Sequence, residues 1–163
     1  MRAIFLDFDG VLHSTDVSIE PGCMPEGSNF FRLVPKLATA LRPHDVHIVI
    51  SSAWAGAFER DAILGYIGIE LAARVIGDTS AHCFRGRSRY RECELAAQSL
   101  GITDWVMIDD NVGIVFGDER PTLEMMQRVF FCDPILGLDT MGVIDELGKW
   151  LEAGRNHEED NHS

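Results

Sequence analysis

The sequence predicts an α/β protein, a three-layer sandwich in which helices cover both faces of a central parallel sheet of about five strands. Short apolar runs alternate with amphipathic stretches along the chain, and this order favours right-handed β-α-β crossovers. The 163 residues, 46% of them hydrophobic, suit one compact domain with a sizeable core. We therefore expect a single domain over residues 1–153, followed by a disordered acidic tail at residues 154–163.

Five apolar runs are expected to form the strands. They cover residues 3–6, 46–50, 74–76, 105–108 and 129–131. The second and fourth runs are apolar throughout, which is typical of central strands buried on both faces. The third run is the weakest signal of the five.

Four amphipathic stretches are expected to be helices, at residues 35–41, 57–66, 88–100 and 141–151. Pro35 suits the first turn of its helix, and Gly101 follows the third helix as a C-terminal cap would. Residues 13–29 contain glycines and prolines with little periodicity. We expect a loop or short hairpin there that overhangs the sheet.

The net charge, the length of the apolar runs and the cysteine spacing indicate which binding partners and which cellular location to expect. The chain has 14 Lys and Arg against 26 Asp and Glu, a formal net charge of −12, which argues against an extended nucleic-acid surface or an anionic membrane. No apolar run approaches the roughly 20 residues of a membrane span. The N-terminal segment has no signal-peptide core, and the four cysteines form no CxxC pair. We expect reduced, mostly buried thiols in a cytoplasmic protein.

Acidic and hydroxyl side chains follow three of the predicted strands. Asp7 and Asp9 follow the first, Ser51 and Ser52 the second, and an aspartate pair the fourth, at residues 109–110. Ligands of parallel sheets bind outside the carboxyl ends of the strands. Each group alone could simply cap the following helix, but converging carboxylates repel one another unless a cation compensates. Oxygen ligands without His or Cys favour a hard ion, so the sequence predicts a Mg²⁺ site.

These residues resemble the haloacid dehalogenase (HAD)-like superfamily of phosphatases. The opening DFDGV is similar to its DxDGx(V/L) motif, the run ending in Ser51 to its second motif, and IDDN to its fourth. More narrowly, LDFDGVLH, IVISSAW, an Arg-Tyr pair ahead of a helix and WVMIDD resemble a small capless branch, the HAD domain linked to RNA-repair proteins. The resemblance covers about residues 1–150. It implies a Rossmann-like, HAD-like fold without a full cap domain.

The resemblance also implies roles for the residues of the first two motifs. Asp7 would be the nucleophile that forms an aspartyl-phosphate, and Asp9 would protonate the leaving oxygen and then deprotonate water. Residues at i and i+2 of a strand end point the same way, so both acids could face one phosphoryl group. Gly10 would allow a sharp turn against the substrate. Ser51 would hydrogen-bond a phosphoryl oxygen, and Ser52 is the weaker candidate because it lies one residue past the strand.

The expected metal ligands come from the first and fourth motifs. Mg²⁺ would bridge Asp7 and the phosphate, with the backbone carbonyl of Asp9 as a further ligand. We favour Asp110 as a direct ligand and Asp109 either directly or through water.

The third motif departs from the superfamily pattern, because the usual lysine is absent. The stretch RGRSRYR instead supplies arginines, which can grip phosphate oxygens with two hydrogen bonds. Arg89 is the first choice, because its Arg-Tyr pair matches the capless branch, and Arg91 and Arg87 follow. The alternative is that this arginine cluster is only a solvated face.

The remaining candidates are weaker. His13 either touches substrate or packs at the surface or in the core. Trp54 is expected to pack in the core rather than to stack on a base. The other residues considered are expected to be incidental (His44, His47, His82) or part of the core (Met125, Met126).

We therefore predict a Mg²⁺-dependent phosphohydrolase whose substrate is a phosphorylated small molecule or a nucleic-acid end, with no membrane partner. A site without a cap is open to bulky phosphoesters. Two alternatives remain: a catalytically inactive HAD-like binding module and a receiver-like phospho-acceptor domain. A receiver-like domain would have no use for Asp9, and its acid pair would not be divided between two strands in this way.

Overall fold

The computed structural model describes residues 1–16 and 29–160 of the chain, with side chains as far as residue 154. Strands and helices alternate as expected. In chain order the elements are β1 Arg2–Leu6, α1 Val34–Leu41, β2 His47–Ile50, α2 Trp54–Ala57, α3 Arg60–Ala72, β3 Val75–Asp78, α4 Arg89–Leu100, β4 Asp104–Asp109, α5 Val112–Phe116, α6 Leu123–Gln127, β5 Val129–Phe131 and α7 Val143–Asp160. A single 3₁₀ turn, Ser80–His82, follows β3.

The five strands form one parallel sheet in the order β3-β2-β1-β4-β5. Leu6, the last residue of β1, pairs with Ile50 of β2 on one side and with Ile108 of β4 on the other. The carboxyl ends of these three strands therefore meet at the centre of one edge. The predicted fold class, a Rossmann-like three-layer sandwich around a parallel sheet, is confirmed.

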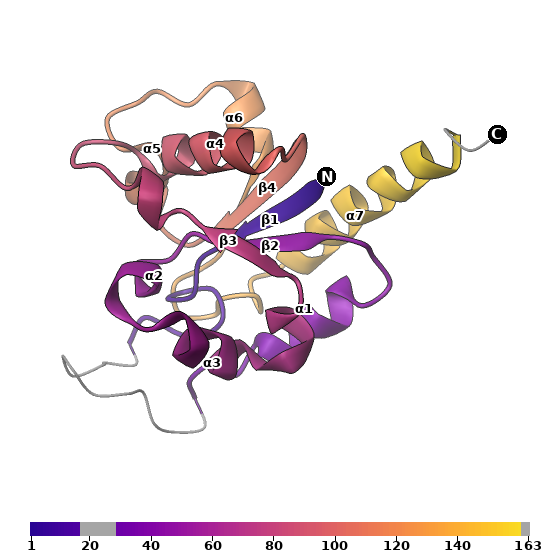
Figure 1. Ribbon diagram of the computed structural model, residues 1–163, viewed down its shortest axis with the longest axis horizontal. Coiled ribbons are helices and arrows are strands. Elements are labelled where there is room, and N and C mark those ends of the chain that lie inside the picture. The colour runs from indigo at the N-terminus through magenta and orange to yellow at the C-terminus, as the bar shows by residue number, and fades with distance from the viewer. Residues whose placement is uncertain (17–28, 161–163) are drawn as a thin grey trace.

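The two faces of the sheet are covered by different helices. α4, α5 and α6 pack on one face, and α1, α3 and α7 pack on the other (Figure 1). Because side chains alternate along a strand, even-numbered residues such as Ile4 and Ile48 face the second group, and odd-numbered ones such as Phe5 and Met107 face α4. This alternation decides which strand-end side chains can meet α4.

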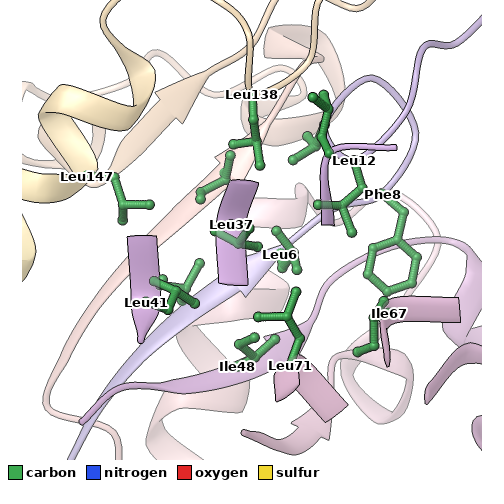
Figure 2. Close-up of a cluster of buried hydrophobic side chains, with 14 of the residues drawn as sticks. Leu6, Phe8, Leu12, Leu37, Leu41, Ile48, Ile67, Leu71, Leu138 and Leu147 are labelled. Carbon is green, nitrogen blue, oxygen red and sulfur yellow. The ribbon is translucent and has the colours of Figure 1, made fainter. Parts of the chain in front are cut away.

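The larger core lies under α1, α3 and α7. Figure 2 shows leucines of α1 and α7 converging with those of β1 and α3, and Phe8 extends the cluster toward the end of β1. Leu6, Phe8, Leu37 and Leu71 are fully buried. The edge that holds the acidic residues is thus supported by packed aliphatic and aromatic side chains.

The helix predicted at residues 57–66 is α3, which begins later, at Arg60, and continues to Ala72; a separate short helix, α2, precedes it. Phe58 between them has an extended backbone, and its ring centroid lies 4.6 Å from that of Trp54. This packing breaks the helix where the sequence pattern continues. α3 also has a kink at Gly68, whose φ of 74° is easily adopted only by glycine.

Several further boundaries differ from expectation. α7 continues past the predicted end at residue 151, because the polar residues that follow include strong helix formers. The short helices α5 and α6 were not predicted, and Met126 of α6 is 43% exposed rather than in the core, whereas Met125 is buried. Cys93 and Cys132 are buried and Cys83 is exposed.

Some expectations lie outside the described residues. These are most of the predicted loop (residues 17–28), Cys23 within it, and the last three residues of the predicted tail. Within the described part of the chain, no helix is long and apolar enough to cross a bilayer.

Leu71 and Ile69 offer a matched test of the core, because both are aliphatic residues of α3. Leu71 is fully buried, whereas Ile69 is 91% exposed. We expect Leu71→Ala to lower the free energy of unfolding by about 2–5 kcal/mol, through lost burial and a residual cavity, and Ile69→Ala to change it by less than about 0.5 kcal/mol. Urea denaturation followed by circular dichroism measures both. Equal effects would contradict the packing of α3.

Candidate active site

Three neighbouring strands deliver the acidic and hydroxyl residues to one edge of the sheet. Asp7 follows β1, Ser51 follows β2 and Asp109 ends β4. All three continue the odd-numbered series, so their side chains emerge on the face that α4 covers. The structure therefore brings the residues of the first, second and fourth motifs together, as predicted.

Arg89 of α4 joins the two buried acids of this edge. Its Nη1 donates to Asp7 Oδ2 at 2.7 Å and to Asp109 Oδ2 at 2.9 Å. The second oxygen of each carboxylate accepts a backbone N–H, that of Phe8 for Asp7 and that of Asn111 for Asp109, both at 2.8 Å. Asp7 is 5% exposed and Asp109 is fully buried. Both carboxylates are thus fixed at both oxygens.

The buried position shifts the pKa of each partner in this cluster. Burial has the largest influence on the pKa of Asp7 and raises it, the Asp109 carboxylate adds to the rise, and Arg89 opposes both. Burial alone would lower the pKa of Arg89, but the two carboxylates outweigh it and the pKa is raised. The guanidinium therefore remains charged and favours the ionised form of Asp7.

Asp110 completes a cluster of three acids. Carboxylate oxygens of Asp7, Asp109 and Asp110 lie within 4.8 Å of one another. Burial raises the pKa of Asp110, and its neighbour Asp109 adds to the rise. The single guanidinium of Arg89 cannot neutralise three carboxylates. An oxygen-only donor set with excess negative charge fits Mg²⁺.

Gly10 is needed beside this cluster. Its φ is 69°, and a Cβ at this position would overlap the carboxylate of Asp110. The glycine of the first motif therefore serves both the turn after β1 and the close approach of an acid from β4.

Asp9 is held from a different direction. Its Oδ1 lies 3.0 Å from His13 Nε2, and its Oδ2 accepts the Trp54 indole N–H at 2.9 Å. Burial would raise the pKa of Asp9, but these two hydrogen bonds outweigh it and the pKa is lowered. The side chain keeps 44% of its surface exposed. The buried side chains of His13 and Trp54 therefore orient the Asp9 carboxylate, which remains open to solvent.

His13 and Trp54 are supporting residues and not contact points for a substrate. His13 is fully buried and Trp54 is 3% exposed. The His13 ring packs against Phe30, Phe31 and Trp54, and its Nδ1 has no hydrogen-bond partner among the described residues. A proton on Nδ1 would be buried without an acceptor, so we infer that Nε2 holds the proton and donates to Asp9.

These positions correct one expectation and extend another. A fully buried His13 cannot touch substrate, so its alternative role in packing is the one observed. Trp54 packs in the core as expected, but its hydrogen bond to Asp9 was missed. The sequence signals available were the placement of Trp54 three residues after Ser51 and of His13 four residues after Asp9.

Both serines of the second motif lie at the edge. Ser51 Oγ is buried and has no hydrogen-bond partner in the described part of the chain. The Ser52 hydroxyl forms a hydrogen bond with Asp7, which opposes the rise that burial causes in the pKa of Asp7. Ser52, the weaker candidate from sequence, is therefore also part of the site.

The other arginines of the third motif point elsewhere. Arg91 pairs with Glu94 at 2.8 Å and Glu119 at 2.9 Å. Arg87 donates to the backbone carbonyl of His82 at 2.7 Å and lies over the ring of Phe84. The expectation that Arg91 and Arg87 bind substrate gains no support from this geometry, because their guanidinium groups are engaged away from the acids.

The fold and the site together define a class. A parallel sheet with two acids after β1, two at the end of β4 and a cation from the intervening helix is the arrangement of a HAD-like phosphohydrolase. Residues 3–143 match the family described as the HAD domain in Swiss Army Knife RNA repair proteins, and the chain belongs to this family. No curated protein and no solved structure matches the chain.

Arg89 and Arg91 form a matched pair on α4. We expect Arg89→Ala to weaken phosphate affinity and slow phosphoryl transfer by about 2–4 kcal/mol in total, because a buried charge-assisted pair is lost. Arg89→Lys should recover part of this, since a point charge replaces the neutralisation but not the planar geometry. Arg91→Ala should leave the kinetics unchanged. Steady-state hydrolysis of a phosphate ester measures all three, and an inactive Arg91→Ala with an active Arg89→Ala would refute the assignment.

The indole hydrogen bond to Asp9 can be removed with little loss of packing. We expect Trp54→Phe to lower kcat about tenfold, which corresponds to one lost hydrogen bond to a charged group, while KM stays within about twofold. Trp150→Phe is the control, because its indole donates to Asp104 at 3.1 Å, far from the site. If both variants lower kcat equally, or if only KM changes, Trp54 does not act through Asp9.

Proposed function

We propose that the protein is a Mg²⁺-dependent phosphatase that hydrolyses phosphoric monoesters through an aspartyl-phosphate on Asp7. The observation that supports this most directly is the shared contact of Arg89 Nη1 with Asp7 and Asp109. It holds the Asp7 carboxylate in place at the end of β1, beside further acids that could hold a metal.

The reaction would proceed in two displacements at phosphorus. A carboxylate oxygen of Asp7 attacks, the P–O bond to the leaving group breaks, and Asp9 in its protonated form gives a proton to the departing oxygen. Asp9 then takes a proton from water, whose oxygen attacks phosphorus and breaks the bond to Asp7. Phosphate is released, and the Asp7 carboxylate and the Asp9 proton are restored.

The remaining residues would bind and neutralise the phosphoryl group. Arg89 would offset the charge that accumulates between Asp7 and the phosphate dianion. Ser51, whose hydroxyl is unpaired among the described side chains, would donate to a phosphoryl oxygen. Asp7, Asp109 and Asp110 would hold Mg²⁺, with the Asp9 carbonyl as an expected further ligand, and the bound ion would supply additional charge stabilisation.

The family description makes the phosphorylated end of a nucleic acid the leading substrate. Among residues 1–16 and 29–154 no domain-sized insertion follows the strand ends of the site, which suits a bulky ester. The net charge of −12 argues that contacts stay local to the end of the strand.

Metal-dependent turnover tests this proposal. We expect hydrolysis of p-nitrophenyl phosphate with Mg²⁺, loss of activity on addition of EDTA, and recovery when Mg²⁺ is restored. Zn²⁺ should replace it poorly, because the group of potential ligands found among the described residues consists of three acids without a His or Cys. Activity that survives thorough chelation would refute the metal site, and its complete absence with Mg²⁺ would favour a catalytically inactive binding module.

Two isosteric variants separate the roles of the acids in the same assay. Asp7→Asn should abolish turnover and prevent a stable BeF₃⁻ adduct, while metal binding weakens only partly. Asp9→Asn should still bind substrate but lose turnover by roughly 10²–10⁴-fold. Asp61→Asn, at an exposed position on α3, is the control and should be fully active. Full activity of either active-site variant would contradict its assignment.

A further inference from the structure

A cavity of about 310 Å³ adjoins the acidic cluster. It lies between α2, the residues that follow β3 and the start of α4. Its wall includes Ser51, Gly56, Thr79, Arg89 and Glu92. Because Arg89 belongs both to this wall and to the acidic cluster, the cavity opens directly beside the position proposed for the phosphoryl group.

Arg89 has hydrogen-bonding capacity left on this side. Its Nη1 serves both carboxylates, and no further hydrogen bond from its guanidinium is found in residues 1–16 and 29–154. A guanidinium has five N–H donors in a planar fork. The remaining donors are therefore available to a ligand that enters the cavity.

Most of the wall is apolar, and it carries a few polar groups besides Arg89. Glu92 is 7% exposed, and no ion pair joins it to any described residue; its neighbour is the Cys83 thiol. Thr79 is 4% exposed, and the Ser51 hydroxyl is buried without a partner among the side chains described. The Glu92 carboxylate, to which the Cys83 thiol is hydrogen-bonded, has acceptor capacity left for a ligand that enters the cavity.

The charges of this wall select the kind of ligand. The Glu92 carboxylate disfavours a second phosphate group, and the Arg89 guanidinium disfavours a cation. Neutral hydroxyl groups satisfy both, since a hydroxyl donates to the carboxylate and accepts from the guanidinium. The volume lies at the lower end of the range for small-molecule sites, which suits a group the size of one sugar ring.

We propose that this cavity is a subsite for the hydroxylated group that bears the phosphate, a ribose-sized sugar, with Glu92 and the free edge of Arg89 as its recognition groups. The inference rests on the proposed function, because that function places the phosphoryl group beside Arg89. It makes sugar phosphates, including those at the end of a nucleic acid, the substrate class in preference to phosphorylated amino-acid side chains.

Binding can be measured separately from turnover by using Asp9→Asn protein with Mg²⁺ in a calorimeter. We expect ribose 5-phosphate to bind at least about tenfold more tightly than pentyl phosphate, which has the same chain length but no hydroxyls. O-phosphoserine should bind no better than pentyl phosphate. Equal affinities, or a preference for O-phosphoserine, would overturn the proposal.

Two substitutions in that background locate the preference in the cavity. Gly56 lies in the wall, and a Cβ there meets nothing within 4 Å, so Gly56→Leu should add a bulky side chain at the cavity without disturbing the backbone. Both Gly56→Leu and Glu92→Gln should bring the affinities for ribose 5-phosphate and pentyl phosphate within about twofold of each other. The affinity for inorganic phosphate should stay as it was. Gly65→Leu, also at an open helical position, should retain the preference. A preference that persists in both cavity variants would overturn the subsite.

Hydrolysis of acetyl phosphate by the unmodified protein distinguishes this inference from the function on which it rests. Its leaving group is too small to occupy the cavity. Turnover of acetyl phosphate together with equal affinities for ribose 5-phosphate and pentyl phosphate refutes the subsite alone. Selective binding of ribose 5-phosphate without any turnover refutes the phosphatase and retains the subsite as a binding site.

Discussion

The arrangement of the site depends on one guanidinium nitrogen placed between two buried carboxylates. Arg89 Nη1 joins Asp7 at the end of β1 to Asp109 at the end of β4. Without it the two acids would face each other in surroundings of low dielectric constant, where repulsion is strong and removal of one partner is costly. The position of this nitrogen depends in turn on α4, which begins at the Ser88 cap and packs Tyr90 against the sheet.

The two acids of the first motif are supported from opposite sides of the sheet edge. Asp7 is held by the Arg89 guanidinium on the side of α4, and Asp9 by His13 and Trp54 from the aromatic cluster on the other side. Their chemical environments differ accordingly, since burial raises the pKa of Asp7 while two hydrogen bonds lower that of Asp9. The difference in surroundings arises because β1 ends at Leu6 and the chain then turns at Gly10.

The order of strands and helices could be predicted because a strand that is buried on both faces of a sheet is apolar throughout. Such a short, continuous apolar run is easy to recognise in the sequence. Helix boundaries were less predictable where packing overrides local preference. Phe58 packs on Trp54 with an extended backbone and separates α2 from α3. Met126 lies on the exposed side of α6, and the five residues of this helix are too few to show a helical period in the sequence. In both cases the deciding contact comes from outside the local stretch of chain.

The sequence by itself determined that acids would gather at the ends of β1 and β4, since the carboxyl ends of parallel strands share one edge. It also supplied an arginine in place of the usual lysine. Only the tertiary structure decided which arginine serves. At 3.6 residues per turn, Arg89 and Arg91 project about 200° apart from α4, so one docking of the helix can present only one of them to Asp7. The docking observed sends Arg91 to Glu119 instead. On the other side of the sheet edge, packing against Phe31 and Trp54 buries His13 next to Asp9, because such contacts depend on how separate elements pack and not on their spacing along the chain.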